Sequence, residues 1–246
     1  MSTFSFKQFD IVQDKVAQKV GTDGVLLGAW CSLDKQPHKI LDIGSGTGLI
    51  SIMCAQRFPQ AFIEAVEIDH DAFEQTASNF ESSKFKDQLY AYHASFQEFY
   101  DEVDERYDFM VSNPPFYNAQ SIKSDDQIES RRQQARFDDA LPFEELFYGV
   151  YKLLAIDGTF ALVFPVDREE RVLEIADYFT MMPTRKMYVR GTVDSPVKRV
   201  FMELRFRESV IKSNQKLVTQ HMVIEHSRHE YTDEYIALTK DFYLKM

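Results

Sequence analysis

Cysteine is scarce in this chain of 246 residues, and the little there is lies in apolar surroundings. The two cysteines, Cys31 and Cys54, fall in segments typical of buried helices, which predicts free thiols in a reducing compartment. Two thiols cannot supply the framework of a small disulfide-bonded domain. The length and the 44% of hydrophobic residues instead allow one ordinary domain with a core of its own.

Long apolar runs are also missing, and so is an excess of positive charge. No stretch is long enough to cross a bilayer, and residues 1–15 interleave charges with aromatic side chains where a signal peptide would be apolar. A soluble cytoplasmic protein is therefore expected. The net charge of −11 argues against wholesale electrostatic coating of nucleic acid or of a membrane surface.

One local exception to the acidic balance lies late in the chain. Residues 185–216 contain nine basic residues against three acidic ones, which predicts a local basic surface. Other cations fall in the aperiodic segment 117–140, whose length is unusual in a compact domain and indicates function or mobility. The candidates for holding RNA phosphates are Arg131, Arg132, Arg136, Lys198 and Arg199. The alternative for the first two is ion pairing with neighbouring acids on a solvated surface.

Short β-branched runs alternate with helical periodicities from residue 39 onward, the pattern of βαβ units in a mainly parallel sheet. Five strands are predicted, at 39–43, 61–67, 89–93, 107–112 and 159–165. Two more, at 184–189 and 200–206, are joined by a turn, which favours an antiparallel hairpin at the edge of the sheet. The sequence therefore predicts an α/β domain with seven strands, mainly parallel, with an antiparallel edge strand.

Helices are indicated between these strands. Pro142 at a first helical position, with Glu144 and Glu145 behind it, predicts a helix that ends near Leu154. Further helices are predicted at 49–58, at 71–82, from Glu169 and from Thr232.

A glycine-rich turn, residues 42–48, follows the first predicted strand and leads directly into a helix. Glycines let a ligand approach the backbone, and the start of a helix offers free N–H groups. A phosphate ligand is disfavoured because the spacing is GxGxG, no Lys-Ser/Thr pair follows, and Asp42 would repel it. A cationic ligand that carries an amino acid fits better. Glu67 ends the next strand, where an acid typically binds ribose hydroxyls; the alternative is a glycine turn with an incidental surface acid.

The tetrapeptide Asn-Pro-Pro-Phe at 113–116 follows the fourth predicted strand. The prolines restrict the residue before them, so Asn113 is held extended at the carboxyl end of a strand. The amide oxygen of Asn113 and the carbonyl oxygen of Pro114 can accept the hydrogens of a planar amino group, and Phe116 can stack on its ring. The alternative is a Pro-Pro turn with a core phenylalanine.

The glycine loop, Glu67 and the Asn-Pro-Pro-Phe motif, in this order, resemble the class I methyltransferases that use S-adenosylmethionine (SAM) to methylate amino groups. The resemblance implies a Rossmann-like fold, with Asn113, Pro114 and Phe116 at the target nitrogen. Pro115 belongs to the same motif. The implied cofactor-binding residues are Asp42, Gly44, Gly46, Gly48, Glu67, Ser95, Thr22 and Asp23. Ser95 is included because the usual acid for the adenine of SAM is missing after the third strand, so Ser95 or the backbone must substitute. Thr22 could equally be only a helix N-cap.

Three regions outside these motifs are similar to the bacterial tRNA1(Val) adenine N6-methyltransferases: Lys19–Trp30, Gln134–Arg136, and the ending Tyr231–Tyr235 with Leu238–Tyr243. This resemblance implies transfer of a methyl group to the adenine beside the anticodon of a tRNA. It also implies one methyltransferase domain over 1–246, with 1–36 as an extension packed on the cofactor site and 37–246 as the SAM-binding core.

Two other functions stay open from the sequence. A protein glutamine amide presents the same planar hydrogens, so an N5-glutamine methyltransferase is one alternative, and a non-catalytic SAM- or RNA-binding module is another. Three late histidines, His221, His226 and His229, have no nearby cysteine or ligand spacing, so no metal is expected. A monomer without membrane contact is expected.

Overall fold

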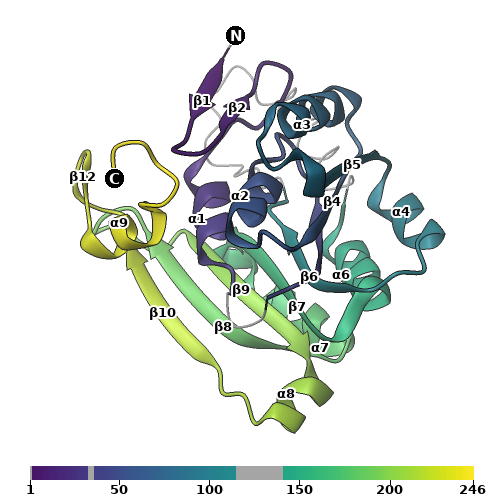
Figure 1. Ribbon diagram of the computed structural model, residues 1–246. Coiled ribbons are helices and arrows are strands. Elements are labelled where there is room, and N and C mark those ends of the chain that lie inside the picture. The colour runs from purple at the N-terminus through teal and green to yellow at the C-terminus, as the bar shows by residue number, and fades with distance from the viewer. Residues whose placement is uncertain (1, 33–35, 115–140) are drawn as a thin grey trace, which may run out of the picture.

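The computed structural model describes residues 2–32, 36–114 and 141–246 (Figure 1). Its centre is an eight-stranded sheet of order β10-β8-β9-β7-β6-β3-β4-β5. The strands are β3 (Lys39–Ile43), β4 (Phe62–Glu67), β5 (Leu89–His93), β6 (Tyr107–Ser112), β7 (Leu154–Pro165), β8 (Met181–Arg190), β9 (Arg199–Phe206) and β10 (Val218–Val223). Strands β3 to β7 are parallel, and β9 runs antiparallel to both β7 and β8.

The five predicted parallel strands and the antiparallel hairpin are confirmed. The sheet nevertheless has one strand more than predicted, because β10 pairs in parallel with β8 and lies outside the hairpin. Residues Val218–His221 of β10 are exposed, and the strand carries Thr219, Gln220 and His221. An edge strand with polar residues shows no apolar alternation, so the sequence pattern did not reveal it.

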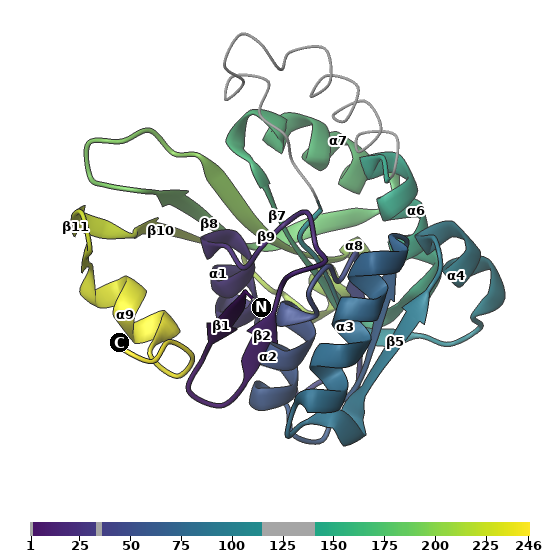
Figure 2. The same ribbon diagram turned by 90° about the horizontal axis from the view of Figure 1, so that it is seen from above.

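Helices cover both faces of the sheet, as Figure 2 shows. One face carries α1 (Thr22–Trp30), α2 (Leu49–Arg57), α3 (His70–Ser82) and α9 (Asp233–Thr239). The other face carries α4 (Phe96–Glu102), α6 (Phe143–Leu153) and α7 (Glu169–Tyr178), and α8 (Arg207–Ser213) follows β9. The predicted helices are confirmed to within one or two residues at each end. Burial of their apolar stripes in two cores, one on each face, stabilises this three-layer arrangement.

Two small hairpins lie outside the main sheet. One consists of β1 (Thr3–Ser5) and β2 (Asp10–Val12), the other of β11 (Glu225–Ser227) and β12 (Glu230–Tyr231). The side-chain amide of Asn79 on α3 both donates to and accepts from the backbone of Val12, at 2.9 and 3.0 Å. This bridge holds the N-terminal hairpin against α3. No helix in the described part of the chain is long and apolar enough to cross a membrane.

Candidate cofactor and active site

The loop between β3 and α2 contains three glycines with positive φ, namely Gly44 at 72°, Gly46 at 58° and Gly48 at 75°. A Cβ atom on Gly44 or Gly46 would meet nothing within 4 Å, so both glycines face open space. A Cβ atom on Gly48 would instead lie 2.6 Å from the ring of Phe80. The first two glycines therefore leave a cradle for a ligand, whereas the third allows α2 and α3 to pack closely.

Side chains of α3 hold this loop from behind. The Thr76 hydroxyl donates to the carbonyl oxygen of Gly46 at 2.9 Å, and the Asn79 amide donates to that of Thr47 at 2.8 Å. Both side chains are buried. The sequence analysis missed these two residues because a polar residue at a helix position usually faces solvent. Their spacing of three residues places them on one face of α3, which is the only signal the sequence carries.

Asp42 lies beneath the glycine loop rather than in a cavity. Its side chain is buried, and one carboxylate oxygen accepts hydrogen bonds from the hydroxyl and the backbone N–H of Ser51, at 2.7 and 3.1 Å. The other oxygen has no hydrogen-bond partner among the described residues. Burial raises the pKa of Asp42 to about 6, and the Ser51 hydrogen bonds oppose this shift. The structure thus places Asp42 behind the loop, and direct binding of the cofactor by Asp42 stays a prediction.

Glu67, the last residue of β4, contacts the glycine loop from the neighbouring strand. Its carboxylate accepts the backbone N–H of Gly46 at 2.8 Å and that of Asp69 at 3.0 Å. The side chain is largely buried but borders a cavity, as expected of a ribose-binding acid. Each carboxylate oxygen has two lone pairs, so both keep acceptor capacity for ligand hydroxyls.

Two adjoining cavities of about 310 and 290 Å³ lie at this edge of the sheet. We call the first the methionine chamber and the second the nucleoside chamber. The methionine chamber is bordered by 18–24, by the glycine loop and by Asn113. The nucleoside chamber is bordered by 15–18, by 66–69 and again by Asn113. Asn113 therefore stands in the wall that both chambers share.

Asn113 directly follows β6, which has the bounds predicted for the fourth strand. The hydroxyl of the preceding Ser112 donates to the carbonyl oxygen of Ile43 at 2.9 Å, which joins the ends of β6 and β3. A Cβ atom on Gly24 of α1 would lie 3.7 Å from the Asn113 amide nitrogen, so α1 lies directly beside this side chain. Pro114 is buried and borders the nucleoside chamber. Pro115 and Phe116 lie outside the described residues.

The methionine chamber offers partners for both charges of an amino acid. Asp23 borders it with a carboxylate, which suits an ammonium group. The N-cap of α1 is Gly21, which makes no side-chain cap, so the N–H groups of the first turn are available to a carboxylate. Thr22 is therefore not the N-cap, and its position on the chamber wall agrees with cofactor contact. The open glycine cradle, the two charge partners and Glu67 together fit SAM.

Ser95 is the N-cap of α4. Its hydroxyl caps α4, accepting the backbone N–H of Glu98 at 3.1 Å and donating to the Glu98 carboxylate at 2.8 Å. Ala94 and Phe96 border the nucleoside chamber, whereas Ser95 is not among its described lining residues. Ser95 thus forms a capping box, and contact of Ser95 or the backbone with the adenine of SAM stays a prediction.

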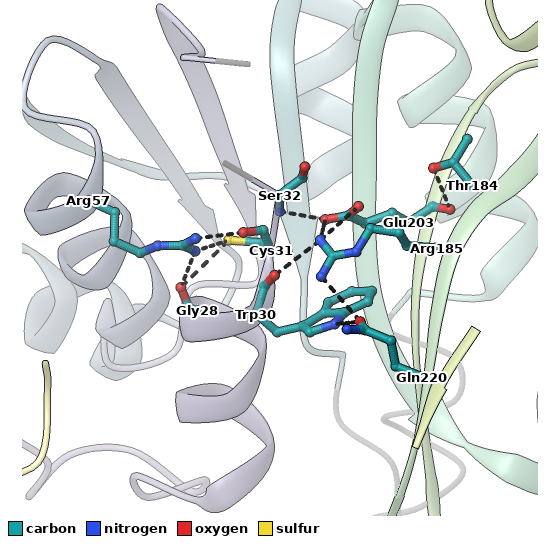
Figure 3. A network of polar contacts seen from close by, with 9 residues as sticks. All are labelled: Gly28, Trp30, Cys31, Ser32, Arg57, Thr184, Arg185, Glu203 and Gln220. Atoms are coloured by element: carbon teal, nitrogen blue, oxygen red, sulfur yellow. Dashed lines mark hydrogen bonds and ion pairs between the residues drawn. The ribbon is translucent and has the colours of Figure 1, made fainter. Parts of the chain in front are cut away.

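Most cations of residues 185–216 are neutralised within the protein. The Arg185 guanidinium lies 4.3 Å from the Trp30 ring centroid and donates to Glu203 at 3.2 Å (Figure 3). The Lys186 amino group likewise lies 2.7 Å from Glu169. Five of the nine cations of this region thus have an acidic partner, and the local basic surface expected there stays a prediction.

Two RNA-binding candidates of that region lie at the carboxyl edge of the sheet. Lys198 is exposed, and Arg199 donates to Asp23 at 2.7 Å. Arg131, Arg132 and Arg136 lie outside the described residues. No group of three or more His, Cys, Asp or Glu side chains suited to a metal occurs in the described ranges.

The sheet order, the glycine loop and the acid at the end of β4 define a class I methyltransferase, which uses SAM as methyl donor. The model of the methyltransferase small domain family matches residues 24–131. A predicted O-methyltransferase of known structure from Agrobacterium tumefaciens superposes with a TM-score of 0.66 at 14% identity, covering 89% of this chain and 96% of that chain. At that identity the likeness shows the fold alone.

Curated relatives are much closer in sequence. The tRNA1(Val) (adenine(37)-N6)-methyltransferase of Christiangramia forsetii is 46% identical over 245 residues, 99% of this chain and 98% of that protein. The protein of the same name from Flavobacterium psychrophilum is 46% identical over 243 residues, 99% of this chain and all of the relative (100%). The chain therefore belongs to the family of tRNA1(Val) (adenine(37)-N6)-methyltransferases.

Proposed function

We propose that this protein transfers a methyl group from SAM to N6 of adenine 37 in tRNA1(Val). The names of the full-length relatives support the reaction and the substrate. The observation that carries the proposal is the position of Asn113 in the wall shared by the methionine and nucleoside chambers. A side-chain amide at that point lies beside both halves of a bound cofactor.

The residues that hold the cofactor follow from the two chambers. Gly44 and Gly46 give the ligand access to the backbone, and Glu67 accepts the ribose hydroxyls. Asp23 binds the ammonium group, and Thr22 lies beside it. Asp42 and Gly48 act indirectly, because Asp42 holds α2 through Ser51 and Gly48 lets α2 and α3 meet.

Bound SAM supplies a methyl group on a sulfonium, which is electrophilic enough that the chain needs no strong general base. The task of the protein is therefore to place the acceptor nitrogen in line with that group. Asn113 accepts one hydrogen of the adenine amino group through its side-chain oxygen, and Pro114 accepts the other through its carbonyl oxygen. These hydrogen bonds favour a pyramidal, more nucleophilic nitrogen. Phe116 stacks on the ring and Pro115 stiffens the motif.

The substrate base must leave the anticodon stack, because a stacked adenine cannot reach a site at the end of a buried strand. Lys198 and Arg199, with Arg131, Arg132 and Arg136, hold phosphates near the target nucleotide. Such contacts position an RNA without reading its sequence. In this proposal residues 1–246 act as one domain, with 1–36 packed on the cofactor site, and the enzyme works as a cytoplasmic monomer.

Mass spectrometry of nucleosides tests the reaction directly. The purified protein is incubated with SAM and either tRNA1(Val) transcript or the same transcript with guanine at position 37. We expect N6-methyladenosine only in the first RNA. A methylated protein in place of methylated RNA would support glutamine methylation, and neither product would indicate a binding module; either result overturns the proposal.

A further inference from the structure

Asp23 and Arg199 form an ion pair that joins two distant parts of the chain. The Oδ2 atom of Asp23 accepts from Nε of Arg199 at 2.7 Å, and the residues lie 176 positions apart. Asp23 borders the methionine chamber from the first turn of α1, while Arg199 is the first residue of β9. The pair therefore connects the cofactor chamber to the β8–β9 hairpin.

Arg199 lies at the same edge of the sheet as Asn113. It pairs in register with Pro165 at the carboxyl end of β7, and β7 is the neighbour of β6, which leads into Asn113. Lys198 is exposed, and within the described residues its side chain makes no ion pair. The hairpin thus presents two cations two strands away from β6, which leads into the amide that holds the target base in the proposed reaction.

The ion pair is open to exchange. The side chains of Asp23 and Arg199 are 31% and 23% exposed, so water screens their attraction and neither is locked in a dry interior. The other hydrogen bond of the Arg199 guanidinium goes to the backbone carbonyl oxygen of Lys198 at 3.2 Å. Asp23 is thus the carboxylate that neutralises Arg199, and one carboxylate cannot fully neutralise two cations at once.

We infer that Asp23 couples cofactor binding to RNA binding by exchanging partners. Without cofactor, Asp23 neutralises Arg199. With cofactor bound, Asp23 turns to the ammonium group of its methionine part, and the Arg199 guanidinium is released to a phosphate of the RNA. A guanidinium suits this role because its planar donors match phosphate oxygens. The inference rests on the proposed function, since it takes tRNA as the second ligand.

Coupling of this kind is reciprocal. If cofactor tightens RNA binding by a given factor, RNA tightens cofactor binding by the same factor. The effect must also depend on the amino-acid part of the cofactor, because only that part carries the ammonium group. A nucleoside without it fills the nucleoside chamber but leaves the Asp23–Arg199 pair intact.

The experiment measures the dissociation constant of fluorescent tRNA1(Val) transcript by anisotropy, with the full chain at fixed salt. Saturating S-adenosylhomocysteine, which keeps the ammonium group and cannot react, is compared with 5′-methylthioadenosine, which lacks it. We expect about tenfold tighter tRNA binding with the first ligand and no change with the second. Arg199→Gln should abolish this difference while still binding S-adenosylhomocysteine. Lys198→Gln, the matched control, should weaken tRNA binding equally in both states and keep the tenfold difference.

Several results would overturn the inference while leaving the proposed function in place. One is that the protein methylates tRNA1(Val) but its dissociation constant for tRNA does not change when S-adenosylhomocysteine is added. Another is that S-adenosylhomocysteine still tightens tRNA binding tenfold in Arg199→Gln. A third is that 5′-methylthioadenosine tightens tRNA binding as much as S-adenosylhomocysteine does. By contrast, failure to bind or methylate the transcript under any condition overturns the proposed function and the inference with it.

Discussion

The carboxylate of Glu67 accepts the backbone N–H of Gly46 at 2.8 Å, so the acid at the end of β4 holds the centre of the glycine loop that follows β3. The two strands are parallel neighbours, with Ile43 opposite Val66. Their carboxyl ends consequently meet at one edge, where the loop and the acid form parts of a single site. Glu67 therefore both orders the loop and borders the nucleoside chamber.

Replacing Glu67 should weaken cofactor binding more than folding. In Glu67→Gln one acceptor oxygen and the charge are lost, and hydrogen bonds to charged groups contribute about 1.5–3 kcal/mol. We expect the dissociation constant of SAM, measured by calorimetry, to rise tenfold or more. Glu64→Gln is a matched control, because Glu64 is a buried acid on the same strand. Its carboxylate accepts hydrogen bonds from the hydroxyls of Tyr92 and Tyr107, each at 2.7 Å. Glu64 is not among the described residues that line the two chambers. An equal loss of SAM affinity in both variants would contradict the prediction.

Asn113→Ala should abolish turnover while the protein still binds SAM. Removal of a hydrogen-bond partner that acts in the transition state typically lowers the rate by about 100-fold or more. Transfer of labelled methyl to tRNA measures turnover, and calorimetry measures SAM binding. Asn113→Asp keeps an acceptor oxygen at the same place and should retain more turnover than Asn113→Ala. Nearly full activity in the alanine variant would remove Asn113 from the mechanism.

Alanine at Gly46 should act mainly on SAM binding, whereas alanine at Gly48 should act mainly on stability. Gly46→Ala places a methyl group in the open cradle at positive φ, so it should prevent SAM binding at a stability cost of about 1–2 kcal/mol. Gly48→Ala adds a clash with Phe80 and should cost about 1–3 kcal/mol more. Urea denaturation and SAM calorimetry on both variants give the comparison. The assignment of the cradle fails if Gly46→Ala binds SAM normally.

The pH dependence of stability should report on Asp42. Burial raises its pKa from 3.8 to about 6, so the folded protein binds a proton that the unfolded chain releases between these values. The free energy of unfolding contributed by Asp42 therefore falls as pH rises through this window. From pH 5 to pH 8, Asp42→Asn should gain about 1 kcal/mol relative to the unaltered protein, because asparagine does not titrate. Urea denaturation of both proteins at each pH, without SAM, measures this difference. An identical pH dependence of the free energy of unfolding in both proteins would contradict the prediction.

Much of the fold could be predicted because local sequence and local structure agree. Four of the five parallel strands, β3, β4, β6 and β7, are largely buried and apolar, and the glycine loop has positive φ at three positions. Strand β10 and the two small hairpins could not be predicted, since exposed polar strands depend on partners elsewhere for their hydrogen bonds. Ser95 is a different case at the site, because its capping box with Glu98 is a local pattern that the sequence contains.

By itself the sequence determined the chemistry of the site: a glycine turn, an acid after the second core strand, and an asparagine held extended by proline. These features depend on backbone conformations that neighbouring residues impose. Only the tertiary structure decided that Asp42 faces Ser51, that Thr76 and Asn79 hold the loop, and that Asp23 meets Arg199. Contacts between residues far apart in the chain depend on how the strands are ordered and how the helices pack, which no local pattern encodes.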